Sequence, residues 1–101
     1  MKRILLCCTA GMSTSMVVNK MRQAAEQQHI HVEIAATGIE AFTEQFSHYD
    51  CCLSGPQSKY RLEDFSAQAA EQAIPVTVIN SMDYGMMRGG KILADALKLI
   101  A

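Results

Sequence analysis

The sequence has no excess of either charge and no long apolar run. Its 101 residues include nine basic and ten acidic side chains, for a net charge of −1. It therefore lacks the basic footprint of proteins that bind nucleic acid or an acidic membrane surface. The first apolar run is about five residues long, against the ~20 that span a bilayer, and no signal-peptide cleavage region follows it. We expect a soluble, cytoplasmic protein with no nucleic-acid partner and no direct membrane insertion.

The chain also lacks the cysteine patterns of metal and redox sites. Its four cysteines form two adjacent pairs, Cys7-Cys8 and Cys51-Cys52, with no CxxC and no Cys/His spacing typical of zinc. We therefore predict no metal and no cofactor. Adjacent strand residues point to opposite faces, so at most one cysteine of each pair can reach a given site. Burial in a reducing cytosol fits Cys7, Cys51 and Cys52, whereas Cys8 stands where a strand ends.

What the chain does have is a regular alternation of strand and helix patterns. Its length, and the fact that half of its residues are apolar, predict one domain over residues 1–101. The strand patterns cover residues 2–8, 30–34, 50–54 and 76–79. Ser13 or a neighbour is expected to cap the first helix, and Thr37 with Glu40 matches a capping box for a short second one. The glycines within 84–90 predict a loop before a last helix over 90–100.

This βαβαβαβα order predicts an α/β fold with three layers, a four-stranded parallel sheet between helices. The half-buried pattern of residues 30–34 is typical of an edge strand, which gives the strand order 2-1-3-4. That arrangement is open and flavodoxin-like, similar to low-molecular-weight phosphatases. Ligands of such sheets bind at the carboxyl ends of strands, where the winding reverses. Here that point places the loop after Cys8 beside the turn at Gly55.

The segment that follows Cys8 has the composition of an anion-binding loop. A tight turn into a helix directs several backbone N–H groups into one concavity, where the helix dipole adds roughly half a positive charge. The same dipoles would lower the pKa of the Cys8 thiol and make it a nucleophile. The predicted phosphate-binding residues are Thr9, Ala10, Gly11, Met12, Ser13, Thr14 and Ser15.

One residue type is missing from this loop. In phosphatase-type loops a cysteine is followed by five residues and then an arginine, which clamps two phosphate oxygens. Counted from Cys8, that position holds Thr14. The loop therefore suits a carrier that takes up a phosphoryl group and passes it on. A small cysteine-dependent phosphatase and a thiol redox switch stay open as alternatives, the second disfavoured by the missing CxxC.

The motif CTAGMSTS at residues 8–15 closely resembles the active-site loop of one family. These are the enzyme IIB components of the bacterial sugar phosphotransferase system, in its lactose/cellobiose (chitobiose) class. The likeness includes the apolar strand before the motif, Gly55-Pro56-Gln57, and Tyr84-Gly85 before the last helix. Cys7 and Ser54 depart from the family pattern.

This resemblance implies a phosphotransferase that acts as a relay. Cys8 would accept a phosphoryl group from a phosphohistidine on the IIA component, forming a phosphocysteine. It would then pass the group to a sugar, a disaccharide, imported by the membrane IIC component, which holds the protein at the inner membrane. Supporting or docking roles would fall to Gly55, Pro56, Gln57, Asp83 and Tyr84.

Two further groups allow two interpretations each. Asp83, Tyr84 and Arg88 follow the last strand, on the side of Cys8, where they either dock partner proteins or make ordinary loop contacts. The methionines near the same end could form an apolar collar suited to changing partners, or could fill gaps in packing. They are Met12, Met16, Met82, Met86 and Met87.

Overall fold

Four parallel strands form one sheet in the order β2-β1-β3-β4, as predicted. The structure is a computed structural model that describes residues 2–8, 11–38, 42–55 and 62–100. The strands are β1 (Lys2–Cys8), β2 (Val32–Gly38), β3 (Cys51–Ser54) and β4 (Val76–Val78). The predicted limits of the first strand are therefore confirmed.

The central strand β1 is buried on both faces, which explains its unbroken apolar sequence. Ile4 and Leu6 pack into one apolar cluster, which also contains residues of α1 (Gly11–Gln27) and α5 (Gly89–Leu99). The alternate residues, Leu5 and Cys7, pack into a second cluster on the other face with Phe65 and Phe46. This alternation follows from the two-residue period of a strand.

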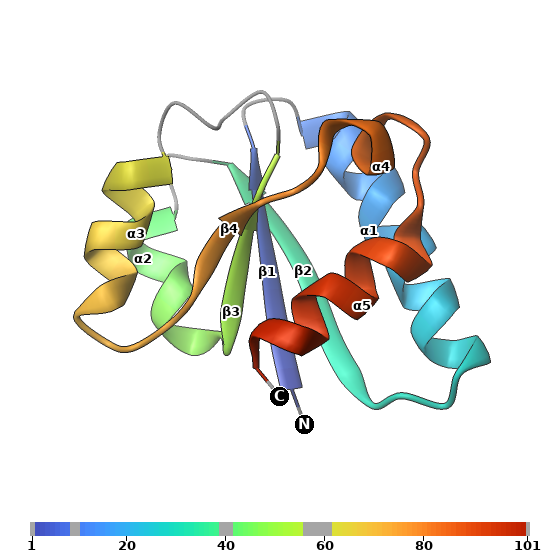
Figure 1. Ribbon diagram of the computed structural model, residues 1–101, viewed down its shortest axis with the longest axis horizontal. Coiled ribbons are helices and arrows are strands. Elements are labelled where there is room, and N and C mark those ends of the chain that lie inside the picture. Colours follow the sequence, from blue (N-terminus) through green and yellow to red (C-terminus); the bar gives the residue numbers. More distant parts are fainter. Residues whose placement is uncertain (1, 9–10, 39–41, 56–61, 101) are drawn as a thin grey trace.

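Helices cover both faces of the sheet, which gives the predicted three layers (Figure 1). α1 and α5 lie on one face. The other face carries α2 (Phe42–Gln45), the 3-10 turn η2 (Phe46–His48) and α3 (Leu62–Ala70). A fifth, short helix, α4 (Ser81–Gly85), follows β4 at the carboxyl end of the sheet.

The two helices on the first face approach closely at Gly89. A Cβ atom at this position would lie 2.4 Å from the carbonyl carbon of Lys20 on α1, well inside contact distance. Only glycine permits this approach without a shift of one helix. Gly90 differs, because its Cβ atom would meet that of Ala24 at 3.7 Å, an ordinary contact.

The prediction for the second strand and the second helix was wrong at Thr37. β2 begins at Val32 and continues to Gly38, so Thr37 is a strand residue that pairs with Cys7 rather than a helix cap. The described part of α2 begins at Phe42, and Glu40 lies outside the described residues. The edge position of this strand, in contrast, is confirmed.

Two further predictions about the helices differ from the structure. α1 begins at Gly11, so Ser13 lies inside its first turn and does not precede it. The segment within residues 84–90 was predicted as a loop, but its first two residues, Tyr84 and Gly85, belong to α4.

Candidate functional site

The carboxyl ends of the strands meet at one edge of the sheet. Cys8, the last residue of β1, lies opposite Gly38 of β2. Cys7 lies opposite Ser54 of β3, and Ser54 lies opposite Val78 of β4. Because β1 lies between β2 and β3, the chain reverses its winding at β1, which is the usual ligand position in such sheets.

α1 begins immediately beyond this edge. Only Thr9 and Ala10, which lie outside the described residues, separate Cys8 from Gly11. The first-turn amides of an α-helix have no partner within the helix, and they carry the positive end of its dipole. No acidic side chain stands in the first turn of this 17-residue helix, so its own sequence places no carboxylate there to compete with an anion.

Most of the predicted loop residues have side chains outside the described part of the chain. Those of Cys8 and of the next six residues lie outside the described part of the chain, although the backbone from Gly11 onward is described. Ser15, on α1, has an exposed side chain. The loop assignment therefore stays a prediction, supported by the limits of β1 and α1.

Gly55, which follows β3, is joined to the end of β1 through the backbone. The amide of Gly55 donates to the carbonyl oxygen of Cys7 at 2.9 Å, and Gly55 is buried. The hydroxyl of Ser54, fully buried, donates to the carbonyl of Gly55 at 3.2 Å. Gly55 is thus beside the strand that ends in Cys8, whereas Pro56 and Gln57 lie outside the described residues.

The other three thiols are buried, as predicted, and form no disulfide. Burial raises the pKa of Cys51 from 9.0 to about 11, with a further contribution from the charge of Asp50. Burial, with smaller contributions from Cys7 and Cys51, raises the pKa of Cys52 to about 12. Thiols with so small a thiolate fraction are poor nucleophiles at neutral pH.

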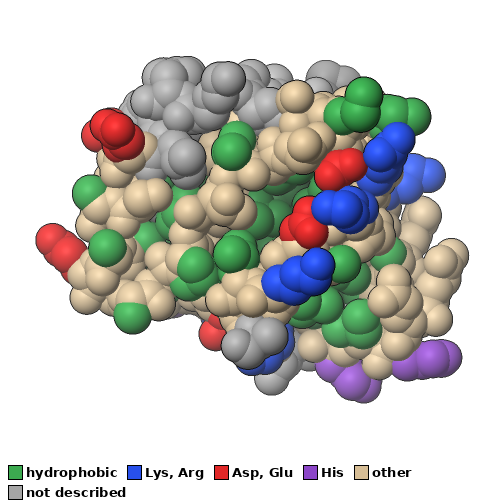
Figure 2. Space-filling model, in the orientation of Figure 1, with side chains coloured by type: hydrophobic (Ala, Val, Ile, Leu, Met, Phe, Trp, Pro, Cys, Tyr) green, Lys and Arg blue, Asp and Glu red, His purple; other side chains and the backbone are tan. Residues whose placement is uncertain are grey.

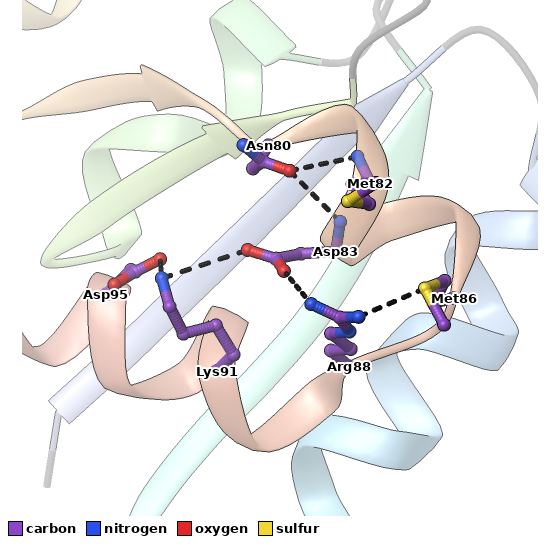
Figure 3. A network of polar contacts seen from close by, with 7 residues as sticks. All are labelled: Asn80, Met82, Asp83, Met86, Arg88, Lys91 and Asp95. Atoms are coloured by element: carbon purple, nitrogen blue, oxygen red, sulfur yellow. Dashed lines mark hydrogen bonds and ion pairs between the residues drawn. The ribbon is translucent and has the colours of Figure 1, made fainter.

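The segment after β4 is built around Asp83, one of the predicted supporting residues. Its carboxylate is buried and lies 3.4 Å from Nη1 of Arg88 and 3.8 Å from Nζ of Lys91 (Figure 3). Lys91 also pairs with Asp95 at 2.7 Å, and this hydrogen bond is the main cause of its raised pKa. Asp83 therefore joins α4 to α5.

Asn80, which the sequence analysis did not identify as functional, starts this segment. Its side-chain oxygen accepts hydrogen bonds from the amides of Met82 at 2.9 Å and Asp83 at 3.1 Å, so it caps α4. The signal was available, because asparagine is among the best N-cap residues. Tyr84, predicted to support the site, packs half-buried against the cluster of α1 and α5.

The methionines divide between the two interpretations. Met16, Met82 and Met86 have large exposed fractions, 52%, 65% and 62%. Met87 packs against the buried cluster and so fills space. The side chain of Met12 lies outside the described residues.

Three further features of the described chain concern a metal site, a hollow and a membrane span. Among them, no group of three His, Cys, Asp or Glu side chains could hold a metal ion. A hollow of about 380 Å³ lies away from the carboxyl ends of the strands, between the end of α1 and the start of β2, and its lining includes Arg22, Glu26, His29 and His31. Across the parts of the chain that the structure describes, no helix is long and apolar enough to span a membrane.

Components of sugar phosphotransferase systems match almost the entire chain. An oligo-beta-mannoside-specific EIIB component of Bacillus subtilis is 39% identical over 99% of this chain and 97% of its own length. A cellobiose-specific EIIB component of Lactococcus lactis is 38% identical over 98% and 96%. A lactose-specific EIICB component of Staphylococcus aureus, 25% identical, matches 91% of this chain with only 16% of its own length.

Solved structures support the same relationship. The cellobiose-specific IIB component of Borrelia burgdorferi superposes with a TM-score of 0.82, at 34% identity, covering 98% of this chain and 91% of the other. A lactose-specific IIB domain of Streptococcus pneumoniae has a TM-score of 0.89 at 17% identity over 99% and 98%, which shows the shared fold. The profile of the lactose/cellobiose-specific IIB subunits matches residues 3–95. The chain therefore belongs to the lactose/cellobiose-specific IIB family of the sugar phosphotransferase system.

Proposed function

We propose that this chain, as one domain over residues 1–101, is a phosphocarrier with Cys8 as its acceptor. It receives a phosphoryl group from a phosphohistidine of the IIA component and transfers it to a disaccharide bound by the membrane IIC component. Its activity is then that of a protein-N-phosphohistidine–sugar phosphotransferase. It acts in the cytoplasm, held at the inner membrane through IIC. The lactose-specific EIICB relative, in which a IIC part and a IIB part share one chain, supports the IIC partner.

One observation carries this proposal. β1 ends at Cys8 where the winding of the sheet reverses, and α1 starts three residues later with no acidic side chain in its first turn. A phosphoryl group beside Cys8 would meet the positive end of a helix dipole and a set of unpaired backbone amides. The competing thiols of Cys7, Cys51 and Cys52 are buried.

The two chemical steps balance without a cofactor. In the first, the Cys8 thiolate attacks phosphorus, an S–P bond forms, and the P–N bond breaks with its electron pair returning to the histidine nitrogen. In the second, a sugar hydroxyl attacks phosphorus, the S–P bond breaks, the thiolate leaves, and the hydroxyl proton passes to water. Amide donors of residues 9–15 stabilise the charge on the three equatorial oxygens during both steps.

The loop lacks the arginine of phosphatase loops, since Thr14 stands in that position. A cation there would stabilise the transition state for attack by water as well as by a partner group. Without it, the phosphocysteine is protected from hydrolysis long enough to reach the sugar. This difference favours a carrier over a hydrolase.

The test is transfer of radiolabelled phosphoryl from a phosphorylated IIA component to three forms of the chain. The wild type and Cys7→Ala should become labelled, whereas Cys8→Ala should not. Cys7→Ala is the matched control because it removes the adjacent thiol and leaves Cys8 in place. Labelling of Cys8→Ala, or release of phosphate from an aryl phosphate by the wild type alone, would contradict the proposal.

A further inference from the structure

We propose that Met82, Met86 and Arg88, which we call the methionine face, dock the phosphorylated donor protein through an apolar centre and a cationic rim. This inference rests on the proposed function and names the surface that one of its partners uses. Met82 and Met86 are 65% and 62% exposed. Met82 lies on α4, and Met86 is its C-cap residue, whose amide donates to the carbonyl of Met82 at 3.0 Å. Residues four apart on a helical turn lie on the same side, so these two side chains form one apolar surface at the end of α4.

The methionine face stands on the edge of the sheet where Cys8 lies. α4 follows β4, whose last residue, Val78, is opposite Ser54, and Ser54 is in turn opposite Cys7. Figure 1 shows α4 at the end of the molecule where α1 begins. A protein that delivers a group to Cys8 must cover this end of the sheet.

The face is held in place before any partner arrives. Asn80 caps α4, and the buried carboxylate of Asp83 pairs with both Arg88 and Lys91 (Figure 3). The amide of Arg88 also donates to the carbonyl of Asp83 at 2.9 Å. Because α4 is fixed at both ends, docking requires little ordering of the backbone, which preserves affinity. The methionine side chains themselves stay adaptable.

The charges around the face select an acidic partner. Nη2 of Arg88 lies 3.1 Å from the sulfur of Met86, and the Arg88 side chain is 48% exposed. The side chain of Lys91 is 57% exposed and pairs with Asp95, which is 44% exposed, whereas that of Asp83 is only 8% exposed, so the exposed charges of the rim are more basic than acidic. Figure 2 shows several basic side chains over α4 and α5, with two acidic side chains among them. Exposed carboxylates on the partner would meet these cations.

This charge pattern distinguishes the phosphorylated donor from the spent one. A phosphoryl group adds roughly 1.5 to 2 negative charges to its carrier. The cationic rim therefore attracts the loaded donor more strongly than the same protein after transfer. Transfer to Cys8 moves that negative charge onto this chain and so favours release of the spent donor.

The test measures binding of the phosphorylated IIA component to a Cys8→Ala chain, which cannot accept the group. In spectra of methyl-labelled methionines, the Met82 and Met86 signals should shift on addition of this donor, and those of buried Met21 should not. The double variant Met82→Gln/Met86→Gln should bind the donor at least about tenfold more weakly. Leu99→Gln is the matched control, since Leu99 is exposed but lies at the far end of α5. Unphosphorylated IIA should bind more weakly than the phosphorylated form.

Equal binding by the double variant and the control would overturn the docking surface. So would shifts of the Met82 and Met86 signals with chain concentration alone, which would indicate a second copy, or with IIC vesicles only. The proposed function has a separate readout, phosphorylation of wild-type Cys8 at saturating donor. If the wild type is labelled and the double variant has unchanged kcat/KM, only the docking inference fails.

Discussion

The backbone amide of Gly55 lies 2.9 Å from the carbonyl oxygen of Cys7, to which it donates a hydrogen bond. This bond extends the pairing of β1 and β3 beyond Ser54, the last residue of β3. On its other side, β1 pairs with β2 as far as Gly38, opposite Cys8. The strand end that presents the proposed phosphoryl acceptor is therefore held from both sides, which fixes its position relative to α1.

The four thiols should differ sharply in reactivity. Cys7, Cys51 and Cys52 are buried, and a pKa of about 11 for Cys51 lowers its thiolate fraction roughly 100-fold below that of a thiol with a pKa of 9.0. Alkylation of the native chain at pH 8 should therefore add one label, at Cys8, and alkylation after denaturation should add four. Mass spectrometry counts the labels. Rapid labelling of two or more native thiols would contradict this assignment.

Stability should fall at alkaline pH because of the same burial. The pKa values of Cys51 and Cys52 are raised in the folded state, so their contribution to the free energy of unfolding is complete below pH 9. As the pH rises from 9 toward 12, unfolding releases their protons and becomes more favourable. Urea unfolding across this range should show the decline. Cys52→Ala should reduce the slope of the free energy of unfolding against pH by the equivalent of about one proton per molecule. An unchanged slope would show that this thiol is not responsible for the decline.

Two neighbouring glycines should respond in opposite directions to alanine. Gly89→Ala places a Cβ atom 2.4 Å from the backbone of Lys20, which forces α5 away from α1 and should cost about 1–3 kcal/mol of stability. Gly90→Ala makes an ordinary contact with Ala24 and should stabilise α5 by up to about 1 kcal/mol. The difference is measured by urea unfolding. Equal effects would disprove the close approach of the two helices.

Loss of the Asn80 cap should affect α4 without disturbing the rest of the fold. Asn80→Ala removes the acceptor of the Met82 and Asp83 amides and should cost about 1 kcal/mol, whereas Asn80→Asp keeps an acceptor there. Hydrogen exchange at these two amides should become faster in the alanine variant only. Unchanged exchange would mean that other contacts hold the helix.

The sequence predicts the strand order and the central strand well because their signals are strong. An uncharged run such as residues 4–7 suits only a strand covered on both faces, and the alternation around Ile34 marks an edge. Thr37 was assigned to a helix cap because Thr37 and Glu40 match a local capping pattern. In the structure it pairs with Cys7, so ladder hydrogen bonds to β1 outweigh the local preference.

The surroundings of the site are harder to predict, since they depend on distant contacts. Three glycines within residues 84–90 favour a loop, and they conceal the fact that Asn80 caps a short helix. Burial of Asp83 follows from its pairing with Arg88 and Lys91, which no local pattern encodes. The exposure of Met82 and Met86 could likewise be known only once α4 was placed.

The most direct test of the central claim is to locate the phosphoryl group after reaction with a phosphorylated IIA component. Cys7 and Cys8 are adjacent, so fragmentation of the peptide that contains both must assign the group to one sulfur. We predict that the fragments carry it on Cys8 alone and that adding IIC with its sugar removes it. A phosphoryl group on Cys7, on a histidine or on a hydroxyl of residues 9–15 would contradict the account.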